Sequence, residues 1–151
     1  MLSSRNEQGL SQAQIQTCIE AWIALGGNAA CALDTSVAEQ SGSRTAFYEE
    51  RNAVALGADV YPSHRVTFGN SARSRMSVLA CLAHELAHAH RFNRGYIRPF
   101  DRMSYLIEEA QASLDASFEL ILDSQDRLDL VEDAHDQTAA WLKLFTEDVE
   151  R

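Results

Sequence analysis

Apolar residues recur at helical spacing in four parts of the chain. The first run follows Ser11 and Gln14, which form the pattern of a capping box, and it ends at Gly26 and Gly27. We expect three further helices over about 71–95, 103–122 and 124–147. The positions predicted to be buried are Met76, Leu79, Ala83, Leu86 and Ala87 in the first of these, Ile107, Ala110, Leu114, Phe118 and Ile121 in the second, and Leu128, Val131, Ala134, Thr138, Leu142 and Phe145 in the third.

A shorter pattern lies between the first two helices. Two apolar runs, 45–48 and 53–56, flank a polar stretch of four residues, which is typical of an antiparallel β-hairpin. The second run is a candidate edge strand for an extended peptide. Residues 57–70 are predicted to form a loop, and we expect residues 1–9 to fray. The fold class is therefore α+β and mostly helical, with one domain over 1–151 and a small hairpin packed on helices.

Composition and charge exclude several classes of protein. The chain has 151 residues and is 46% hydrophobic, which suits one domain with an ordinary core. A net charge of −9 argues against a nucleic-acid-binding surface. No membrane span and no secretory signal are expected, because no apolar run is long enough and the start lacks an apolar stretch. Three cysteines without paired spacing favour a cytoplasmic protein without disulfides.

The segment His84-Glu85-Leu86-Ala87-His88 carries the chemistry, since it places H-E-x-x-H on the helix expected over 71–95. Histidines four residues apart lie on one helix face, so both imidazoles reach one ion. Zinc binds imidazole nitrogen readily and prefers four ligands. Glu85 lies beside this face and is placed to take the proton of an attacking water. The apolar neighbours make an incidental exposed pair a poor explanation, since unused polar groups are costly to bury.

A catalytic zinc also needs a third protein ligand and an open position. His90 lies about 200° around the helix from His88, so it does not face the same ion. The helix over 103–122 carries Glu108 and Glu109, and small residues follow on the side of Glu109, which we prefer as the ligand. A solvated acidic face is the alternative for this pair. The other candidates are His64, Asp101, Asp115 and His135.

At these residues the chain resembles zincin metallopeptidases of the gluzincin type, and it is most similar to the ImmA/IrrE-like family. The likeness covers roughly 45–120 and rests on the strand pair, on 82–88, and on Glu109 with the small residues after it. The resemblance implies a minimal zincin-like fold in which His84, His88 and Glu109 hold Zn²⁺ and Glu85 is the base. The chain departs from the family in lacking a proline after the glutamate helix and in its arginine-rich loop near 94–102.

The first functional hypothesis is a zinc-dependent metallopeptidase that cleaves a dedicated protein partner, and the resemblance associates it with bacterial regulatory or defence modules. The alternative is a non-catalytic zinc-binding module for regulation or protein interaction, and a third is a metal-binding stress or structural protein. Cys81, one turn before His84, is interpreted as a small buried hydrophobe rather than a redox-active group. Candidate oxyanion donors are Tyr96, Arg98, Tyr105 and His135.

Overall fold

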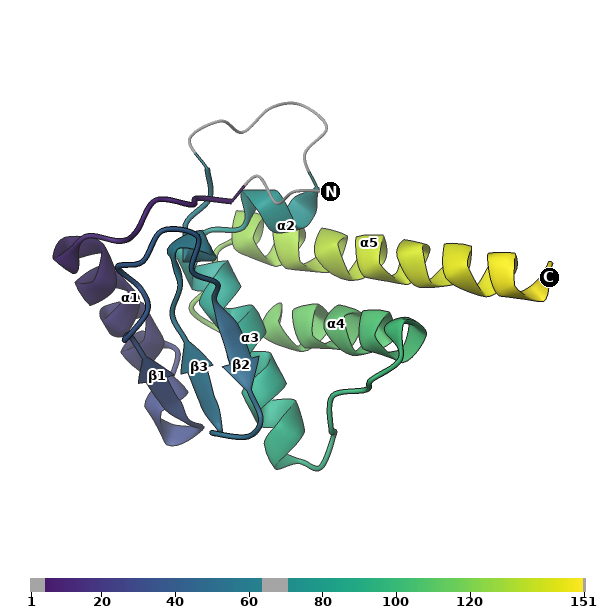
Figure 1. The fold of residues 1–151 in the computed structure, drawn as a ribbon, viewed down its shortest axis with the longest axis horizontal. Helices are drawn as coiled ribbons and strands as arrows, with labels where there is room; N and C mark the ends of the chain where they lie inside the picture. Colours follow the sequence, from purple (N-terminus) through teal and green to yellow (C-terminus); the bar gives the residue numbers. More distant parts are fainter. Residues whose placement is uncertain (1–4, 64–70, 151) are drawn as a thin grey trace.

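A computed structural model describes residues 5–63 and 71–150 (Figure 1). It is mostly helical with one small sheet, as the sequence predicts. No helix in the described part is both long and apolar enough to cross a membrane. The elements in chain order are α1 (Gln12–Ala24), η1 (Gly27–Ala29), β1 (Ala32–Asp34), β2 (Ala46–Tyr48), β3 (Ala53–Ala55), η2 (Ala58–Val60), α2 (Ala72–Arg75), α3 (Val78–Asn93), α4 (Arg102–Ala116) and α5 (Ser124–Val149).

The predicted hairpin is confirmed as β2 and β3, which pair antiparallel with Phe47 opposite Val54. Its turn includes Asn52 at a φ of 46°, a left-handed conformation that asparagine tolerates better than most residues. An additional strand, β1, pairs parallel with β3 on its other side. Since the strand order is β1-β3-β2, the expectation that 53–56 forms an edge is wrong, and β2 is the edge nearest α3 and α4 (Figure 1).

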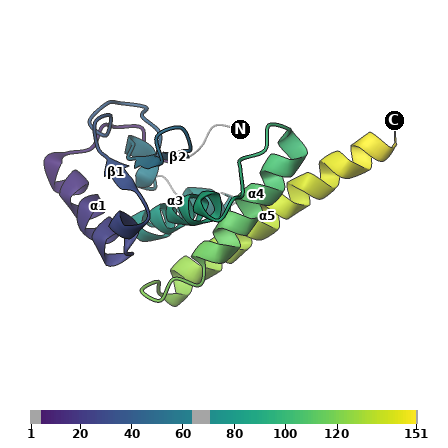
Figure 2. The ribbon, with the colours of Figure 1, turned by 90° about the horizontal axis from the view of Figure 1, so that it is seen from below.

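Helices α1 and α3 lie side by side under the sheet, and the α4–α5 hairpin lies beyond α3 (Figure 2). The capping box of α1 is confirmed, because the Ser11 side chain accepts from the Gln14 amide and the Gln14 side chain accepts from the Ser11 amide. Trp22 on α1 is fully buried in the core. Gly27 packs so tightly on this indole that an added Cβ would lie 2.2 Å from a ring carbon.

The helix expected over 71–95 is broken into α2 and α3. Ser77 starts the second piece, because its side chain accepts a hydrogen bond from the Ala80 amide at 3.1 Å. The same hydroxyl donates to Asp126 of α5 at 2.7 Å. This bond to a distant element fixes the position of the break, which the local pattern does not reveal.

The side chain of Arg5 fills this break. Its guanidinium donates to the carbonyl oxygens of Met76 and Val60, each at 2.6 Å, and of Asp59 at 2.8 Å. Arg5 is buried, although we expected residues 1–9 to fray. One buried cation thus satisfies backbone carbonyls from two separate segments.

Helix α4 ends at Ala116, before the predicted end near 122. Arg127 of α5 holds the following turn by donating to the carbonyls of Ser117 at 2.7 Å and Glu119 at 2.9 Å. Phe118 and Ile121 were expected to be buried, and they are 76% and 47% exposed because this turn directs them to solvent.

Helix α5 faces the core with its acidic side. The four positions Leu128, Val131, Leu142 and Phe145 were expected to be buried, and all are exposed. Asp129 and Asp133 are buried instead, because the guanidinium groups of α2 lie against them, with Arg73 3.0 Å from Asp133 and Arg75 3.5 Å from Asp129. Ion pairing with a short neighbouring helix therefore decides which side of α5 is buried.

We predict that Arg5→Ala lowers the free energy of unfolding by about 3 kcal/mol, because it leaves several buried carbonyl oxygens without donors. The measurement is urea denaturation followed by circular dichroism. Arg102→Ala, at the exposed start of α4, is the matched control and should leave the midpoint unchanged. Equal midpoints for the two variants would show that Arg5 does not hold this break together.

Candidate metal centre

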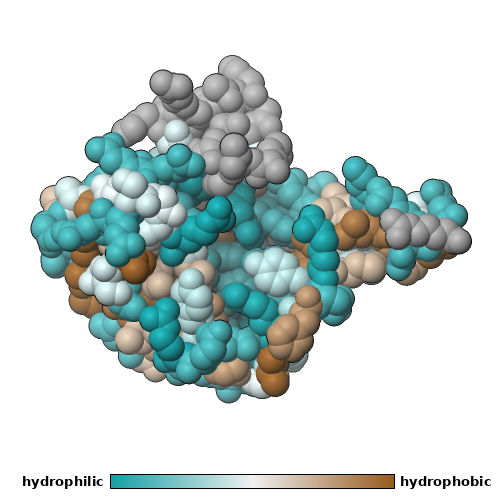
Figure 3. Space-filling view, viewed as in Figure 1, coloured by the Kyte–Doolittle hydropathy of each residue, from teal (hydrophilic) through white to brown (hydrophobic). Residues whose placement is uncertain are grey.

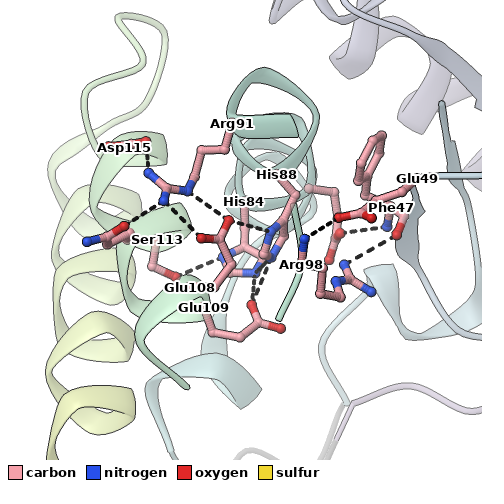
Figure 4. A network of polar contacts seen from close by, with 12 residues as sticks. Phe47, Glu49, His84, His88, Arg91, Arg98, Glu108, Glu109, Ser113 and Asp115 are labelled. Carbon is pink, nitrogen blue, oxygen red and sulfur yellow. Dashed lines mark hydrogen bonds and ion pairs between the residues drawn. The ribbon is translucent and has the colours of Figure 1, made fainter. Parts of the chain in front are cut away.

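Three ligand atoms from α3 and α4 converge on one point (Figure 4). The Nε2 atoms of His84 and His88 are 3.1 Å apart, and each is 2.8 Å from Oε2 of Glu109. All three side chains are buried. Within 5–63 and 71–150 this is the one group of three or more histidine, cysteine or acidic side chains arranged to hold a metal ion.

The spacing of these atoms suits zinc. Bonds of about 2.0–2.1 Å at tetrahedral angles place neighbouring ligand atoms roughly 3.3 Å apart. The three ligand atoms lie 2.8, 2.8 and 3.1 Å from one another, which is close to the edge lengths of one face of such a tetrahedron. All three residues line a cavity of about 330 Å³, so the fourth position opens toward this cavity.

The chemistry of the donor set also fits a cation. Nδ1 of His84 lies 2.8 Å from Oγ of Ser113, and this hydroxyl donates to Asp133 at 2.6 Å. Ser113 therefore accepts from the Nδ1–H of His84, and the lone pair of Nε2 points at the Glu109 carboxylate. Two acceptors facing each other need a positive charge between them, and a bound metal supplies it. Such an outer hydrogen bond on a ligating histidine orients the ring and fixes its tautomer.

Glu108 takes a different position from its neighbour. Its carboxylate is paired with Arg91, whose Nε and Nη2 lie 2.8 and 2.9 Å from the two oxygens. Oε1 of Glu108 is 4.0 Å from Nδ1 of His88, behind the imidazole (Figure 4). The structure thus brings Glu109 to the two histidines and leaves Glu108 as an ion-pair partner on their outer side.

The other proposed ligands lie elsewhere. His90 and His135 are exposed, and Asp101 caps the start of α4 by accepting from the Ser104 amide at 2.9 Å. Asp115 pairs with arginines at the end of α3. His64 lies outside the described residues.

The carboxylate of Glu109 is held in its ionised form. Burial raises its pKa, but when no metal is bound, hydrogen bonds from the protonated imidazoles of His84 and His88 outweigh this and hold the pKa well below its usual range. Arg73 adds a cation 3.4 Å from the same oxygen. Glu109 is therefore available as a charged ligand at neutral pH.

Glu85 lines the same cavity as the three ligand residues. Its Oε2 accepts a hydrogen bond of 2.9 Å from the backbone N–H of Phe47 on β2. Burial raises the pKa of the Glu85 carboxyl to about 7. A carboxyl with this pKa, fixed by a backbone donor next to the ligand cluster, can accept and release a proton near neutral pH.

Two of the four candidate oxyanion donors are in the cavity. Tyr105 and Arg98 line it, with the guanidinium 5.9 Å from the tyrosine ring centre. Burial and the charge of Glu109 raise the pKa of Tyr105, so its hydroxyl keeps the proton that it would donate. The Tyr96 ring lies instead against Arg91, with the guanidinium carbon 4.5 Å from the ring centre. His135 is exposed on α5.

Cys81 also lines the cavity without joining the ligand cluster. Burial raises the pKa of its thiol to about 12. The side chain therefore stays protonated at neutral pH, and it packs partly buried against the apolar core. This agrees with its interpretation as a small hydrophobe.

Two arginines, Arg44 and Arg98, line the cavity in a chain whose net charge is −9. Neither guanidinium has a carboxylate oxygen within 4.0 Å in the part of the chain that the structure describes, while the Arg98 backbone amide donates to Oε1 of Glu49 at 2.5 Å. Figure 3 shows hydrophilic side chains gathered around the hollow between the sheet and the α4–α5 hairpin. Arginines thus line the cavity together with the carboxylates of Asp59, Glu85 and Glu109.

Comparisons with protein-family models, with curated proteins and with solved structures find no match for this chain. Function is therefore inferred from the chemistry of the site.

Three residues that support the ligands were not predicted from the sequence, namely Arg73, Ser113 and Asp133. A signal for Asp133 was present, because acidic residues at 126, 129, 133 and 136 follow helical spacing on one side of α5. Such a stripe indicates either a solvated face or a face turned toward cations. The arginines of α2 are the cations, and only the tertiary structure brings them there.

We predict that Glu109→Gln removes most of the zinc from protein purified with one equivalent of metal, because a three-ligand site rarely survives the loss of a charged ligand. Glu108→Gln is the matched control and should retain it. Zinc is measured by inductively coupled plasma mass spectrometry after dialysis. Loss of zinc from the Glu108 variant alone would reverse the ligand assignment.

We also predict that Asp133→Asn weakens zinc binding by about 10–100-fold, because the Ser113 bridge to His84 loses its anchor. Zinc affinity is measured by competition with a chromophoric chelator. Asp129→Asn is the control, since this buried acid also pairs with an α2 arginine but does not reach a histidine ligand. An equal loss of affinity in both variants would assign the effect to the α2–α5 contact.

Proposed function

We propose that this protein is a zinc-dependent metallopeptidase that hydrolyses a peptide bond in a protein or peptide substrate. The observation that carries the proposal is the position of Glu85, a half-buried carboxyl in the same cavity as the cluster of His84, His88 and Glu109. A fixed base beside an open metal position is the arrangement that metal-assisted hydrolysis requires.

The residues of the chain have distinct roles in this mechanism. Zinc, when bound, polarises the scissile carbonyl and makes water more acidic. Glu85 takes the proton of the attacking water and delivers it to the departing amine, and before substrate binds the Phe47 amide holds its carboxylate beside the cavity. The Tyr105 hydroxyl and the Arg98 guanidinium supply donors for the negative charge that develops on the carbonyl oxygen.

The zincin-like character of the fold belongs to the same proposal. The helix α3 with H-E-x-x-H, the glutamate on the next long helix and the hairpin before them support a gluzincin-type domain similar to the ImmA/IrrE-like family. In that family a dedicated protein partner in the bacterial cytoplasm is the expected substrate. Arg44 and Arg98 at the cavity favour a substrate segment with acidic side chains next to the scissile bond.

We predict that zinc-loaded wild-type protein generates new amino termini in a proteome-derived peptide library, with aspartate and glutamate enriched near the cleavage sites. Glu85→Gln should lower the cleavage rate by about 10³-fold or more while keeping its zinc, because the variant lacks the base but retains all three ligands. Mass spectrometry of labelled termini measures the rate, and metal analysis checks the loading.

Two outcomes would contradict the proposal in different ways. If both proteins bind one zinc and neither cleaves any peptide, a non-catalytic zinc-binding module replaces the peptidase. If Glu85→Gln cleaves as fast as the wild type, the activity does not come from this site.

A further inference from the structure

The α4–α5 hairpin leaves a large apolar surface uncovered. We call it the hairpin face, and it consists of side chains that are each 42–76% exposed. Its members are Leu114, Phe118, Ile121, Leu128, Val131, Leu142, Phe145 and Val149.

These side chains lie on one side of the hairpin. Helix α4 buries Ala112 and Ser113, and α5 buries Leu130 and Asp133, on the sides that pack against each other and against α3 and α2. The hairpin face is on the remaining side of both helices. Figure 2 shows α4 and α5 side by side, with the end of α5 projecting past the rest of the molecule.

The hairpin face is as large as the largest apolar patches of ordinary monomers. At their fractional exposures, its two phenylalanines and six aliphatic side chains contribute on the order of 600 Å² in total. The largest apolar patch on a monomer is usually about 300–600 Å². One partner in a standard protein interface buries about 800 Å², so the hairpin face supplies most of the area that a stable dimer needs.

The spacing along α5 is that of a helix-pairing seam. Positions 128, 131, 135, 138, 142, 145 and 149 alternate steps of three and four residues, the pattern of the a and d positions of a coiled coil. Five of these positions are apolar, and the two central ones are His135 and Thr138. Two apolar positions therefore precede a polar centre and three follow it.

The distribution of charge on α5 is compatible with a second copy of the same chain as the occupant. Helix α5 contains seven acidic residues, and none of them falls on a seam position. Two copies of an acidic protein can therefore meet through this surface without opposing carboxylates in the contact. A basic partner, by contrast, would find no complementary charge along the seam.

We propose that two copies of this chain dimerise through the hairpin face around a two-fold axis, with their α5 helices antiparallel. The axis passes between His135 and Thr138, which places Leu128 opposite Phe145 of the second copy and Val131 opposite Leu142. The polar centre of one copy meets the polar centre of the other. The projecting end of each α5 covers the hairpin turn of the other chain, where Phe118 and Ile121 are exposed.

Sedimentation velocity tests the dimer directly with the full chain. The wild type should sediment at twice its mass of 16.8 kDa at micromolar concentration. Leu142→Glu should raise the dissociation constant about 100-fold or more, since each dimer then buries two carboxylates in an apolar contact. Ile23→Glu, at an equally exposed apolar position on α1, is the control and should remain dimeric. Circular dichroism and zinc content verify that both variants are folded.

Disulfide cross-linking tests the antiparallel arrangement independently. A double variant with His135→Cys and Thr138→Cys should form covalent dimers on mild oxidation, whereas Leu128→Cys should not. Cross-linking of the Leu128 variant, with or without cross-linking of the double variant, would indicate parallel helices and overturn the arrangement. A monomeric wild type at tens of micromolar, or dissociation of the Ile23 variant to the same extent, would overturn the dimer itself. Neither result depends on peptidase activity.

Discussion

The carboxylate of Asp133 holds the candidate site together. It receives a hydrogen bond from Ser113 of α4 and an ion pair from Arg73 of α2, and through Ser113 it sets the orientation of His84 on α3. Four helices thus meet at one buried negative charge. An acid in such a place is stabilising only when every partner is present, because an unpaired buried charge costs several kcal/mol. The requirement explains why the short helix α2, with its arginines, lies against α5 at all.

The need to pair these buried acids also determines which side of α5 faces the core. A helix with an apolar side and an acidic side would ordinarily bury the apolar one. Here Asp129 and Asp133 are directed inward by the arginines of α2, and the apolar side is left at the surface. The dimer that we propose removes this surface from water. Ordering of the site and association of two chains would then be two results of one choice of helix orientation.

Local patterns in the sequence predicted much of the fold and the central part of the site. The capping box, the hairpin and the three-residue cluster all depend on residues whose relation is set by helix or turn geometry, or by small residues next to Glu109. Three of the errors share one physical origin. The break at Ser77, the early end of α4 and the facing of α5 each depend on a polar side chain from a distant segment, namely Asp126, Arg127 and the α2 arginines. Strand β1 was missed because three residues are too few to show an alternating pattern.

The backbone of Phe47 has a consequence for how any extended chain approaches β2. Its amide is bonded to Glu85 and its carbonyl accepts from Arg98 at 3.3 Å, so the outward-facing pair of groups at this residue is already occupied from within the molecule. A strand that adds to the sheet here must replace the hydrogen bonds that Phe47 makes with Glu85 and Arg98. Binding of an extended chain would then release Glu85 and Arg98 together, which couples binding to the freeing of the two groups to which our proposal assigns the reaction.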